Sequence, residues 1–391
     1  MKLLLYSHYF APSIGGVETI VMSLARGLAE LQTAAETREF GISLVTQTPR
    51  DQFDDKSLPF LVVRKPGFWK LLRLVRGADV VHIAGPSFVP MLLAWILRKP
   101  YIVEHHTYQS ICPNGLLIHH PERSVCPGYF QAGDYAECWR CQSKEVSKIR
   151  SLINVLAAFP RHALVRGASK NVAVSEHVQQ RIAMPRTTVV QHGIDRGSEI
   201  AAPSTFGLPE QRKICLAFVG RFVPEKGLSI FVDALATLAE QGREFEAKLV
   251  GDGPDRHKIE AQIAAARLNS RVKVTGYVSG AELARAVADV SVVVMPSVWE
   301  ETAGLAALEQ MMRGRLVICS DIGGLSEVVG DAGMKFRPGN AEALAACLCR
   351  IIDSPVLIEE LGLKARARAR QFFSRAQMIE DHASIYRGLT K

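Results

Sequence analysis

The sequence predicts an α/β protein made of two doubly wound, parallel-sheet domains in tandem. Short runs of apolar and β-branched residues alternate with segments of helical periodicity, which is typical of βαβ units. The chain has 391 residues, and domains of about 100 to 200 residues make two the expected number. A stretch rich in Ser, Pro and Gly at residues 196–213 separates two series of such units and indicates a linker.

The elements follow in order along the chain. In the first series we expect strands at residues 2–7, 42–47, 79–84, 101–106, 170–175 and 187–193, with helices at 17–31 and 89–97. In the second we expect strands at residues 214–220, 247–253, 272–277, 290–297 and 316–321, with helices at 228–241, 255–268 and after Glu301. The predicted domains are therefore residues 1–196, with a cysteine-rich insert at 108–145, and residues 197–374. A last amphipathic helix at 375–391 is expected to pack back on the first domain.

Composition and charge limit the classes of function. The contents of 48% hydrophobic and 22% charged residues are ordinary for a globular protein. The longest apolar run, residues 88–97, is well below the roughly 18 residues that span a bilayer, and the start is too short for a signal-peptide core, so we expect a cytoplasmic protein. A net charge of +8 and a pI near 9.1 predict an anionic partner.

Basic residues cluster at 65–76 and 364–375, interleaved with leucine or alanine at helical spacing. The clusters fit either solvated helix faces or peripheral contact with an anionic membrane at its inner face. Few aromatic residues lie beside them and no nucleic-acid-binding module is recognisable, so binding of nucleic acid is disfavoured.

Glu301 and Glu309 lie in a segment that predicts a strand end followed by a helix. If the segment were helical throughout, a rise of 1.5 Å per residue would separate the two carboxylates by roughly 12 Å, too far for a glycosidase pair. The separation suits a ligand with two polyhydroxylated ends and a charged middle, such as a nucleotide sugar. Its pyrophosphate would lie near residues 302–305, where a helix N-terminus favours an anion. The alternative is two solvated glutamates on a surface helix.

Two glycine-containing turns precede predicted helices. In residues 219–227, Arg221 and Lys226 stand beside glycine in an arrangement that suits a pyrophosphate, although a surface loop with incidental charge has the same pattern. Gly15 and Gly16 immediately precede the first helix and place backbone amides for a phosphate or sugar. Residues 249–255 hold only half of a dinucleotide fingerprint, which disfavours hydride transfer.

In this order the motifs resemble those of the retaining glycosyltransferases of family 4, whose GT-B fold has two Rossmann-like domains facing a cleft. The resemblance covers nearly the whole chain and is strongest over residues 218–329, where Glu301 and Glu309 match an E-x7-E element. It implies that Glu301 faces the donor sugar, that the backbone after it meets the pyrophosphate, and that Glu309 binds the ribose. The residues expected at the nucleotide-sugar site are Gly15, Gly16, Arg221, Lys226, Gly276, Tyr277, Val278, Glu301, Thr302, Ala303, Gly304, Leu305 and Glu309.

The resemblance also implies a reaction. His106 matches a histidine near the transferred sugar, with neighbouring His105 as the alternative, and the expected catalytic set is His106, Glu301, Arg221 and Lys226. These groups would transfer a hexose with retention from a UDP- or GDP-sugar to a glycan acceptor, and the basic charge favours a lipid-linked acceptor of polysaccharide or glycolipid synthesis. No cofactor is expected for catalysis, and no covalent enzyme intermediate. The sequence departs from the family pattern at Ala303, Ser326, His192, Met312 and Leu316. None of these departures removes a charged group that the reaction requires.

Two other classes of function fit the same pattern. One is a GT-B-like epimerase or phosphorylase, and an epimerase would consume the donor without an acceptor. The other is a non-catalytic nucleotide-sugar-binding subunit of another transferase. The complete set of glutamates, cations and His106 argues against such a subunit, because binding alone has no need of all of them.

Four of the eight cysteines fall in the insert, at Cys112, Cys126, Cys138 and Cys141. A loop of this length with little apolar periodicity needs a staple. Four thiolates on a structural Zn²⁺ would supply one, with His119 and His120 as further ligands, and four reduced cysteines are the alternative. We expect the remaining cysteines to be core residues.

Overall fold

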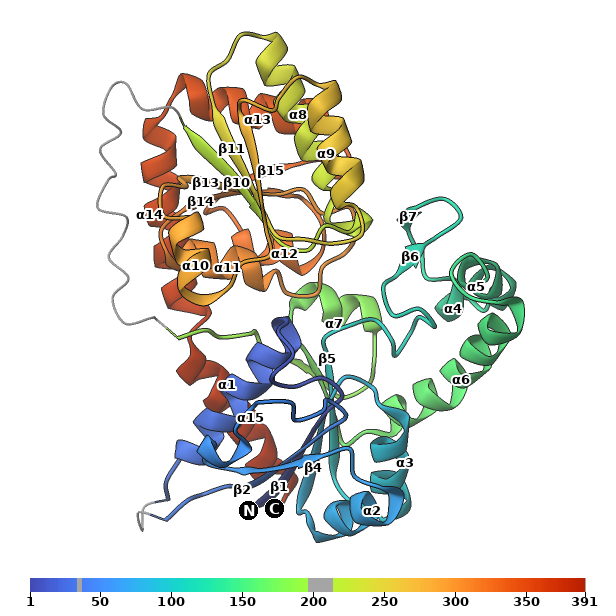
Figure 1. Cartoon of the computed structure of the whole chain (residues 1–391). Coiled ribbons are helices and arrows are strands. Elements are labelled where there is room, and N and C mark those ends of the chain that lie inside the picture. The colour runs from blue at the N-terminus through green and yellow to red at the C-terminus, as the bar shows by residue number, and fades with distance from the viewer. Residues whose placement is uncertain (34–36, 196–213, 391) are drawn as a thin grey trace. The chain divides into compact units, whose positions relative to one another are not determined.

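The computed structural model describes residues 1–33, 37–195 and 214–390. By its internal contacts the chain divides into unit 1, Met1–Asp195 with Ser374–Lys391, and unit 2, Arg196–Phe373 (Figure 1). The linker predicted at residues 196–213 lies outside the described residues. Each unit has a parallel sheet with helices on both faces, which confirms the predicted fold class.

Unit 1 contains a seven-stranded sheet in the order β3-β2-β1-β4-β5-β8-β9, and the paired strands are parallel. Its strands are β1 (Lys2–Ser7), β2 (Gly41–Thr46), β3 (Leu61–Arg64), β4 (Val80–Ala84), β5 (Tyr101–His105), β8 (Lys170–Ala173) and β9 (Thr187–Val189). The central strands β1, β4 and β5 are buried almost end to end, as expected for a parallel sheet covered on both faces. The predicted strand at 187–193 ends early, at Val189.

The helices of unit 1 form two layers. Helix α1 (Gly16–Glu30) contacts α15 (Arg375–Leu389), and α3 (Phe88–Ile96) contacts both α2 (Phe68–Gly77) and α6 (Lys148–Gly167). Figure 1 shows α1 and α15 on one side of the sheet and α2 and α3 on the other. The C-terminal helix therefore belongs to the first unit, where Tyr386 is fully buried. Helix α7 (Glu176–Ile182) joins β8 to β9.

Unit 2 contains a six-stranded sheet in the order β12-β11-β10-β13-β14-β15. Its strands are β10 (Cys215–Val219), β11 (Glu246–Val250), β12 (Val272–Gly276), β13 (Val292–Met295), β14 (Leu316–Ser320) and β15 (Met334–Phe336). Its helices are α8 (Leu228–Glu240), α9 (Arg256–Ala265), α10 (Gly280–Ala286), α11 (Leu305–Met312), α12 (Gly323–Val329), α13 (Ala341–Asp353) and α14 (Val356–Phe372). Apolar side chains of α8, α9 and α13 pack with those of the strands in one core cluster.

The cysteine-rich insert follows β5 and has only short elements. A two-stranded antiparallel sheet of β6 (Ile118–His119) and β7 (Ser124–Val125) is followed by α4 (Tyr129–Ala132) and α5 (Tyr135–Gln142). The chain then enters α6, which contacts α5. The side chain of Ser151 on α6 donates to the carbonyl of Trp139, at 2.7 Å, and so ties the insert to this helix.

Candidate functional site

The candidate site of unit 2 lies where the strand order reverses. Strands β10 and β13 are neighbours, and the chain proceeds from them toward opposite edges of the sheet. Ligands of open α/β sheets bind outside the carboxyl ends of the strands at such a switch point. The segment after β10 carries Arg221 and Lys226, and the segment after β13 carries Glu301. The topology therefore brings these sequence-predicted residues to one edge of the sheet.

The two segments are joined by close backbone contacts. The amide of Val298 donates to the carbonyl of Glu225 at 3.0 Å. Gly227 has φ of +66°, and a Cβ added there would lie 1.9 Å from the carbonyl oxygen of Pro296. No side chain fits at this crossing, so glycine is required for the turn that carries Lys226 to lie against the segment after β13.

Lys226 and Glu301 form an ion pair, with 2.9 Å between Nζ and Oε1. The hydroxyl of Ser297 donates to the same carboxylate oxygen. Glu301 is buried, with 6% of its surface exposed, whereas Arg221 is exposed to solvent. A buried carboxylate is costly unless it is paired and hydrogen-bonded, and here it has a cation and a hydroxyl. Its charge is thus held in place at the end of β13.

The helix after Glu301 begins later than it would if the segment were helical from Glu301 on, which is the case for which the separation of roughly 12 Å was calculated. Helix α11 starts at Leu305, and Gly304 caps it with φ of +61°. Only Glu309 lies on the helix, so the predicted strand end followed by a helix is confirmed, and the separation calculated for a segment that is helical throughout does not apply. The reason is the left-handed glycine, which breaks the helical path between the glutamates. Thr302 and Ala303 belong to the turn, and the first N–H groups of α11, from Leu305 on, lack partners within the helix by its geometry.

Backbone contacts also fix the turn at Glu301 against the start of α12. The amide of Gly324 donates to the carbonyl of Glu301 at 2.6 Å. Gly323 has φ of +66°, and a Cβ there would lie 2.7 Å from both the amide nitrogen and the carbonyl oxygen of Glu301. This second close approach holds the backbone of Glu301 independently of its side chain.

Glu309 is half-buried on α11. Burial raises the pKa of its carboxyl group, and the nearby Arg313 opposes that shift. A carboxylate in this setting gains from a donor that enters with a ligand, such as a hydroxyl. The structure leaves the expected ribose contact a prediction.

Gly276, Tyr277 and Val278, expected to contact the base, lie at the carboxyl end of β12. Gly276 has φ of +76°, and its carbonyl accepts a hydrogen bond from the amide of Gly251 at 3.0 Å. Tyr277 is 61% exposed. The segment is therefore on the same edge of the sheet as Lys226 and Glu301, two strands away from β10.

Unit 1 holds His105 and His106 at the end of β5. His105 is fully buried, and its Nε2 lies 3.0 Å from Oδ1 of Asn171 on β8. Burial lowers the pKa of His105 to about 4. His106 follows the last strand residue, stacks on His192 with 5.2 Å between ring centroids, and lies 3.2 Å from the Glu104 carboxylate. His105 is thus engaged inside the sheet, and His106 stands at its edge.

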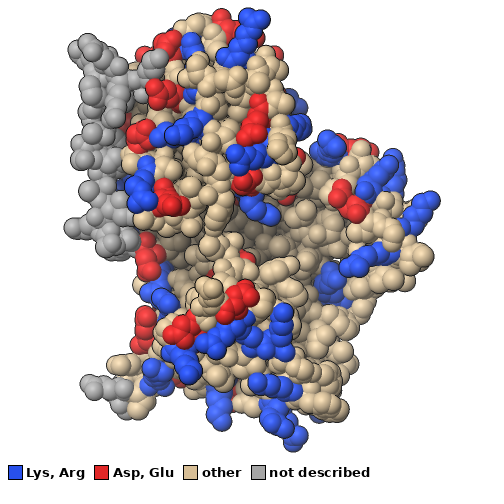
Figure 2. Space-filling view, viewed as in Figure 1, with Lys and Arg blue, Asp and Glu red and all other residues tan. Residues whose placement is uncertain are grey.

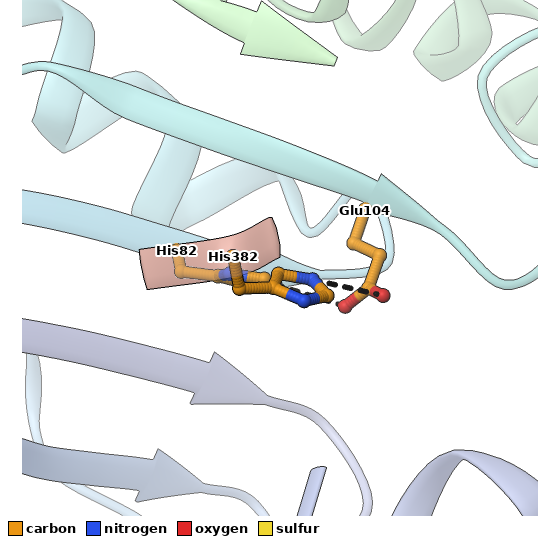
Figure 3. Close-up of side chains that lie close together, drawn as sticks. All are labelled: His82, Glu104 and His382. Atoms are coloured by element: carbon orange, nitrogen blue, oxygen red, sulfur yellow. Dashed lines mark hydrogen bonds and ion pairs between the residues drawn. The ribbon is translucent and has the colours of Figure 1, made fainter. Parts of the chain in front are cut away.

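Glu104 is a buried ionisable residue near His106 that sequence reasoning missed. It is completely buried on β5, and imidazoles from β4 and α15 converge on it (Figure 3). Nε2 of His82 lies 3.0 Å from Oε2, and Nε2 of His382 lies 3.5 Å from Oε1. These partners are far apart in the sequence, so no local sequence pattern predicts that they contact Glu104. Alternation along β5 does place Glu104 and His106 on one face, and that signal was available.

Hydrogen bonds define the protonation of this cluster. Nδ1 of His82 lies 2.7 Å from the hydroxyl of Tyr386, and Nδ1 of His382 lies 2.8 Å from the carbonyl of Met378. Nδ1 of His382 must therefore carry a proton, and its Nε2 faces a carboxylate oxygen that has no hydrogen to give. The favourable state is an imidazolium on His382 beside an ionised Glu104.

The pKa shifts agree with that assignment. Burial alone would raise the pKa of Glu104, but the imidazoles, His106 foremost, hold it well below its usual range. Burial alone would lower the pKa of His382, but Glu104 overcomes this and raises it. Burial lowers the pKa of His82, and lowers that of His192 to about 3, so these rings are neutral. The Glu104 carboxylate is thus ionised beside an imidazolium on the C-terminal helix.

Gly15 and Gly16 stand at the start of α1, as expected from the turn pattern. Gly15 is the N-cap, with extended φ and ψ of −172° and 174°. A Cβ at Gly15 would meet only the carboxylate of Glu18, 2.4 Å from its Oε2. Since that group ends a flexible side chain, the backbone here does not require glycine.

The sequence and the fold of this chain match those of known proteins. Residues 14–197 match the family model described as Glycosyltransferase Family 4, and residues 213–354 match the one described as Glycosyl transferases group 1. An alpha-D-kanosaminyltransferase of Streptomyces kanamyceticus is 32% identical over 81% of this chain and 79% of its own. The chain belongs to glycosyltransferase family 4.

Two further proteins resemble this glycosyltransferase. A 2-deoxystreptamine glucosyltransferase of Streptomyces kanamyceticus is 37% identical, over 43% of this chain and 45% of its own. The crystal structure of Anabaena Alr3699/HepE in complex with UDP superposes with a TM-score of 0.72 at 19% identity, covering 99% of this chain and 100% of that one. The likeness establishes the GT-B type of fold.

The four cysteines of the glycosyltransferase's insert are buried and reduced. The sulfur of Cys126 accepts from the amide of Gly128 at 3.5 Å, and that of Cys141 from the amide of His120 at 3.4 Å. Burial, and then the neighbouring Cys112, raises the pKa of Cys138 to about 12. Among the described residues, the side chains whose ligand atoms lie close enough to share a metal ion are Glu104 and the histidines around it. The sulfurs of the four insert cysteines lie farther from one another than the ligand atoms of those groups do.

The surface of the glycosyltransferase is uneven in charge. Figure 2 shows Lys and Arg side chains at several places on the face of unit 1 in view, some of them beside Asp and Glu. Among helices built from described residues, none has both the length and the apolar character needed to span a bilayer.

Proposed function

We propose that this glycosyltransferase transfers a hexose, with retention at the anomeric carbon, from a UDP- or GDP-sugar to a lipid-linked glycan. The reaction would take place in the cytoplasm, at the inner face of a membrane, in polysaccharide or glycolipid synthesis. The observation that carries the proposal is the ion pair of Lys226 and Glu301, placed at the switch point of unit 2 directly before α11. UDP is the first nucleotide to test, because HepE binds it.

The geometry suits departure of a nucleoside diphosphate. As the bond between the anomeric carbon and the diphosphate oxygen breaks, its electron pair stays on the diphosphate, which gains negative charge. Lys226, Arg221 and the N-terminus of α11 would stabilise that charge more in the transition state than in the ground state. The acceptor hydroxyl forms the new bond on the same face, and its proton leaves with the diphosphate. Glu301 would hold sugar hydroxyls, and His106 would contact the sugar from unit 1.

The acceptor is the least determined part of the reaction. The positive charge of the chain favours an anionic, lipid-linked acceptor over a polyamine. A second candidate comes from the two Streptomyces relatives, one of which is named for 2-deoxystreptamine, a small amine-bearing acceptor. The two candidates predict different acceptors for the same donor.

A product assay separates these outcomes. Purified protein would be incubated with UDP-glucose or GDP-mannose, and with a polyprenyl-linked sugar or 2-deoxystreptamine. We expect nucleoside diphosphate release that depends on the polyprenyl-linked sugar, with an α-linked product by NMR. Transfer to 2-deoxystreptamine alone would overturn the lipid-linked acceptor. Donor conversion without any acceptor would indicate the epimerase alternative, and binding without turnover under every condition would indicate a binding subunit.

We also propose that the four insert cysteines bind a structural Zn²⁺. Support comes from their burial and from backbone amides that point at two of the sulfurs, which suits thiolates. The ion would supply the cation that four buried thiolates need, and it would take no part in the transfer.

Metal analysis tests this role. We expect about one Zn²⁺ per chain by mass spectrometry of the purified protein, lost together with thermal stability in Cys138→Ser. The control is Cys347→Ser, because Cys347 lies on α13 in unit 2, away from the insert. Protein that is free of metal yet equally stable in both variants would contradict the proposal.

A further inference from the structure

Helix α6 is apolar on two opposite faces. One face packs inward through Val155, Ala158, Leu164 and Val165. The other is exposed and carries Ile149 at 76%, Leu152 at 50%, Ile153 at 58% and Leu156 at 57% of their full exposure. These four positions follow the i, i+3, i+4, i+7 spacing of a helix stripe. A stripe of this kind normally faces a partner, so the described part of the chain leaves it uncovered.

The neighbouring helices also expose apolar side chains. Helix α3, which contacts both α6 and α2, exposes Trp95 and Ile96 at 58% each. Helix α2 exposes Trp69 at 76% and Phe68 at 52%. We call eight of the exposed apolar side chains of these three helices the basic apolar face: Phe68, Trp69, Trp95, Ile96, Ile149, Leu152, Ile153 and Leu156.

The charged side chains within these three helices all have one sign. Within the bounds of α2, α3 and α6 the sequence contains no aspartate or glutamate. The exposed cations are Lys70, Arg73, Arg76, Lys148, Arg150 and Arg166. Aromatic and aliphatic side chains mixed with lysine and arginine alone are the composition of helices that lie in the interface of an anionic bilayer.

We propose that the basic apolar face docks the glycosyltransferase on an anionic lipid bilayer. The apolar side chains would enter the headgroup region while the lysines and arginines meet lipid phosphates. A second copy of the chain is a poorer occupant, because a symmetric contact would bring identical cations together. Of the two basic clusters seen in the sequence, this assigns the one at residues 65–76 to the membrane and adds α6, which sequence charge alone did not single out.

The docking surface deepens the proposed function, since it rests on a lipid-linked acceptor for its purpose. Its test does not use turnover, so the two can fail separately. Purified full-length protein would be sedimented with vesicles of phosphatidylglycerol and phosphatidylcholine, and with phosphatidylcholine alone. We expect binding to the anionic vesicles that weakens at least about tenfold in 0.5 M salt, as screening of several lysines and arginines requires.

Two variants locate the contact. We expect the triple variant Ile149→Ser, Leu152→Ser, Ile153→Ser to reduce the partition coefficient by about tenfold or more, because each loses buried apolar area. The matched control is Val356→Ser, Leu363→Ser, which removes two exposed apolar side chains of α14 in unit 2 and should leave vesicle binding unchanged. Circular dichroism and thermal unfolding confirm that both variants fold.

Three results would overturn the proposal. The first is wild-type protein that stays in solution with anionic vesicles at low salt. The second is equal vesicle binding by the wild type and the α6 variant. The third is a concentration-dependent dimer that the α6 variant abolishes, which light scattering would show and which would assign the face to a second copy.

Discussion

Glu301 of unit 2 and Glu104 of unit 1 are both buried carboxylates with a cationic partner, but their surroundings differ. Glu301 pairs with one lysine that itself keeps 20% of its side-chain surface in solvent, and its turn is fixed by backbone contacts to two glycines. Glu104 has no exposure and is enclosed by imidazoles from β4, from the position after β5 and from the C-terminal helix. A ligand can reach and rearrange the first pair, whereas the second is part of the core.

This difference separates function from stability. Lys226 can exchange its bond to Glu301 for one to a ligand phosphate without unfolding anything. Removing a partner from Glu104 instead leaves a buried charge or an unsatisfied imidazole, which is strongly destabilising. Because His106 lies on the same carboxylate, Glu104 also orients the histidine expected to face the sugar.

The largest effect is expected for Glu104→Gln. The change leaves the His382 imidazolium without its counter-charge and should lower the free energy of unfolding by about 3–5 kcal/mol. Urea denaturation of the wild type and the variant measures it. Glu301→Gln is the matched control and should cost at most about 1 kcal/mol, since its partner can turn to solvent. Equal losses in the two variants would remove the distinction between the sites.

Lys226→Ala should abolish most turnover. Loss of one group that stabilises developing charge lowers kcat by about 10²- to 10³-fold. Initial rates at saturating donor measure this. The control is Lys364→Ala, which breaks another lysine–carboxylate pair, the one to Asp331 at 2.9 Å on the surface of unit 2. A Lys226→Ala enzyme as active as the control would exclude Lys226 from the reaction.

Acid should destabilise unit 1 through its neutral buried histidines. His105 and His192 have folded pKa values of about 4 and about 3, below the value of 6.5 expected when unfolded. Their contribution to the free energy of unfolding is complete above pH 6.5. It falls as the pH drops toward 4, by about 1.4 kcal/mol per pH unit for each histidine. His382 acts with the opposite sign, because its raised pKa gives stability that is present below pH 6.5 and lost as pH rises through the folded value.

Urea denaturation at a series of pH values from 4 to 9 measures both effects on the free energy of unfolding. His192→Asn should flatten the acid limb, and His382→Asn should remove the loss on the alkaline side. A wild-type curve that is flat from pH 4 to 7 would contradict the neutral assignment of His105 and His192.

The smallest expected effect concerns the glycines before the two helices. Gly304→Ala forces a Cβ into positive φ and to 3.1 Å from the Cα of Leu325, which should cost about 1–2 kcal/mol. Gly15→Ala meets only the mobile Glu18 carboxylate and should change stability by less than about 0.5 kcal/mol. Thermal unfolding of the two variants compares them directly. A cost at Gly15 that matched the one at Gly304 would show that the backbone at α1 is as constrained as that at α11.

The sequence predicted much of unit 2 because its candidate site residues lie in short segments that follow strand ends. Lys226 follows β10 and Glu301 follows β13, so parallel strands bring them to one edge. The break at Gly304 was not predicted, since the sequence does not show which φ a glycine between a strand and a helix adopts. Strands β3 and β15 were not predicted.

The cluster in unit 1 was not predictable in the same way. His82, Glu104 and His382 come from three elements, and their proximity depends on α15 returning to the first unit after the chain has passed through all of unit 2, Arg196–Phe373. The exposed stripe of α6 was likewise hidden, because a helix that is apolar on two sides looks like an ordinary core helix until one side is found in solvent.

The central claim is that unit 2 binds a nucleoside diphosphate through the segment from Lys226 to Glu309. Isothermal titration of the purified protein with UDP, GDP and ADP tests it directly. The account predicts selective binding of one diphosphate, weakened about tenfold to a hundredfold in Glu309→Ala, as loss of a hydrogen bond to a charged group requires. Absence of binding for all three, or equal affinity in wild type and Glu309→Ala, would contradict it.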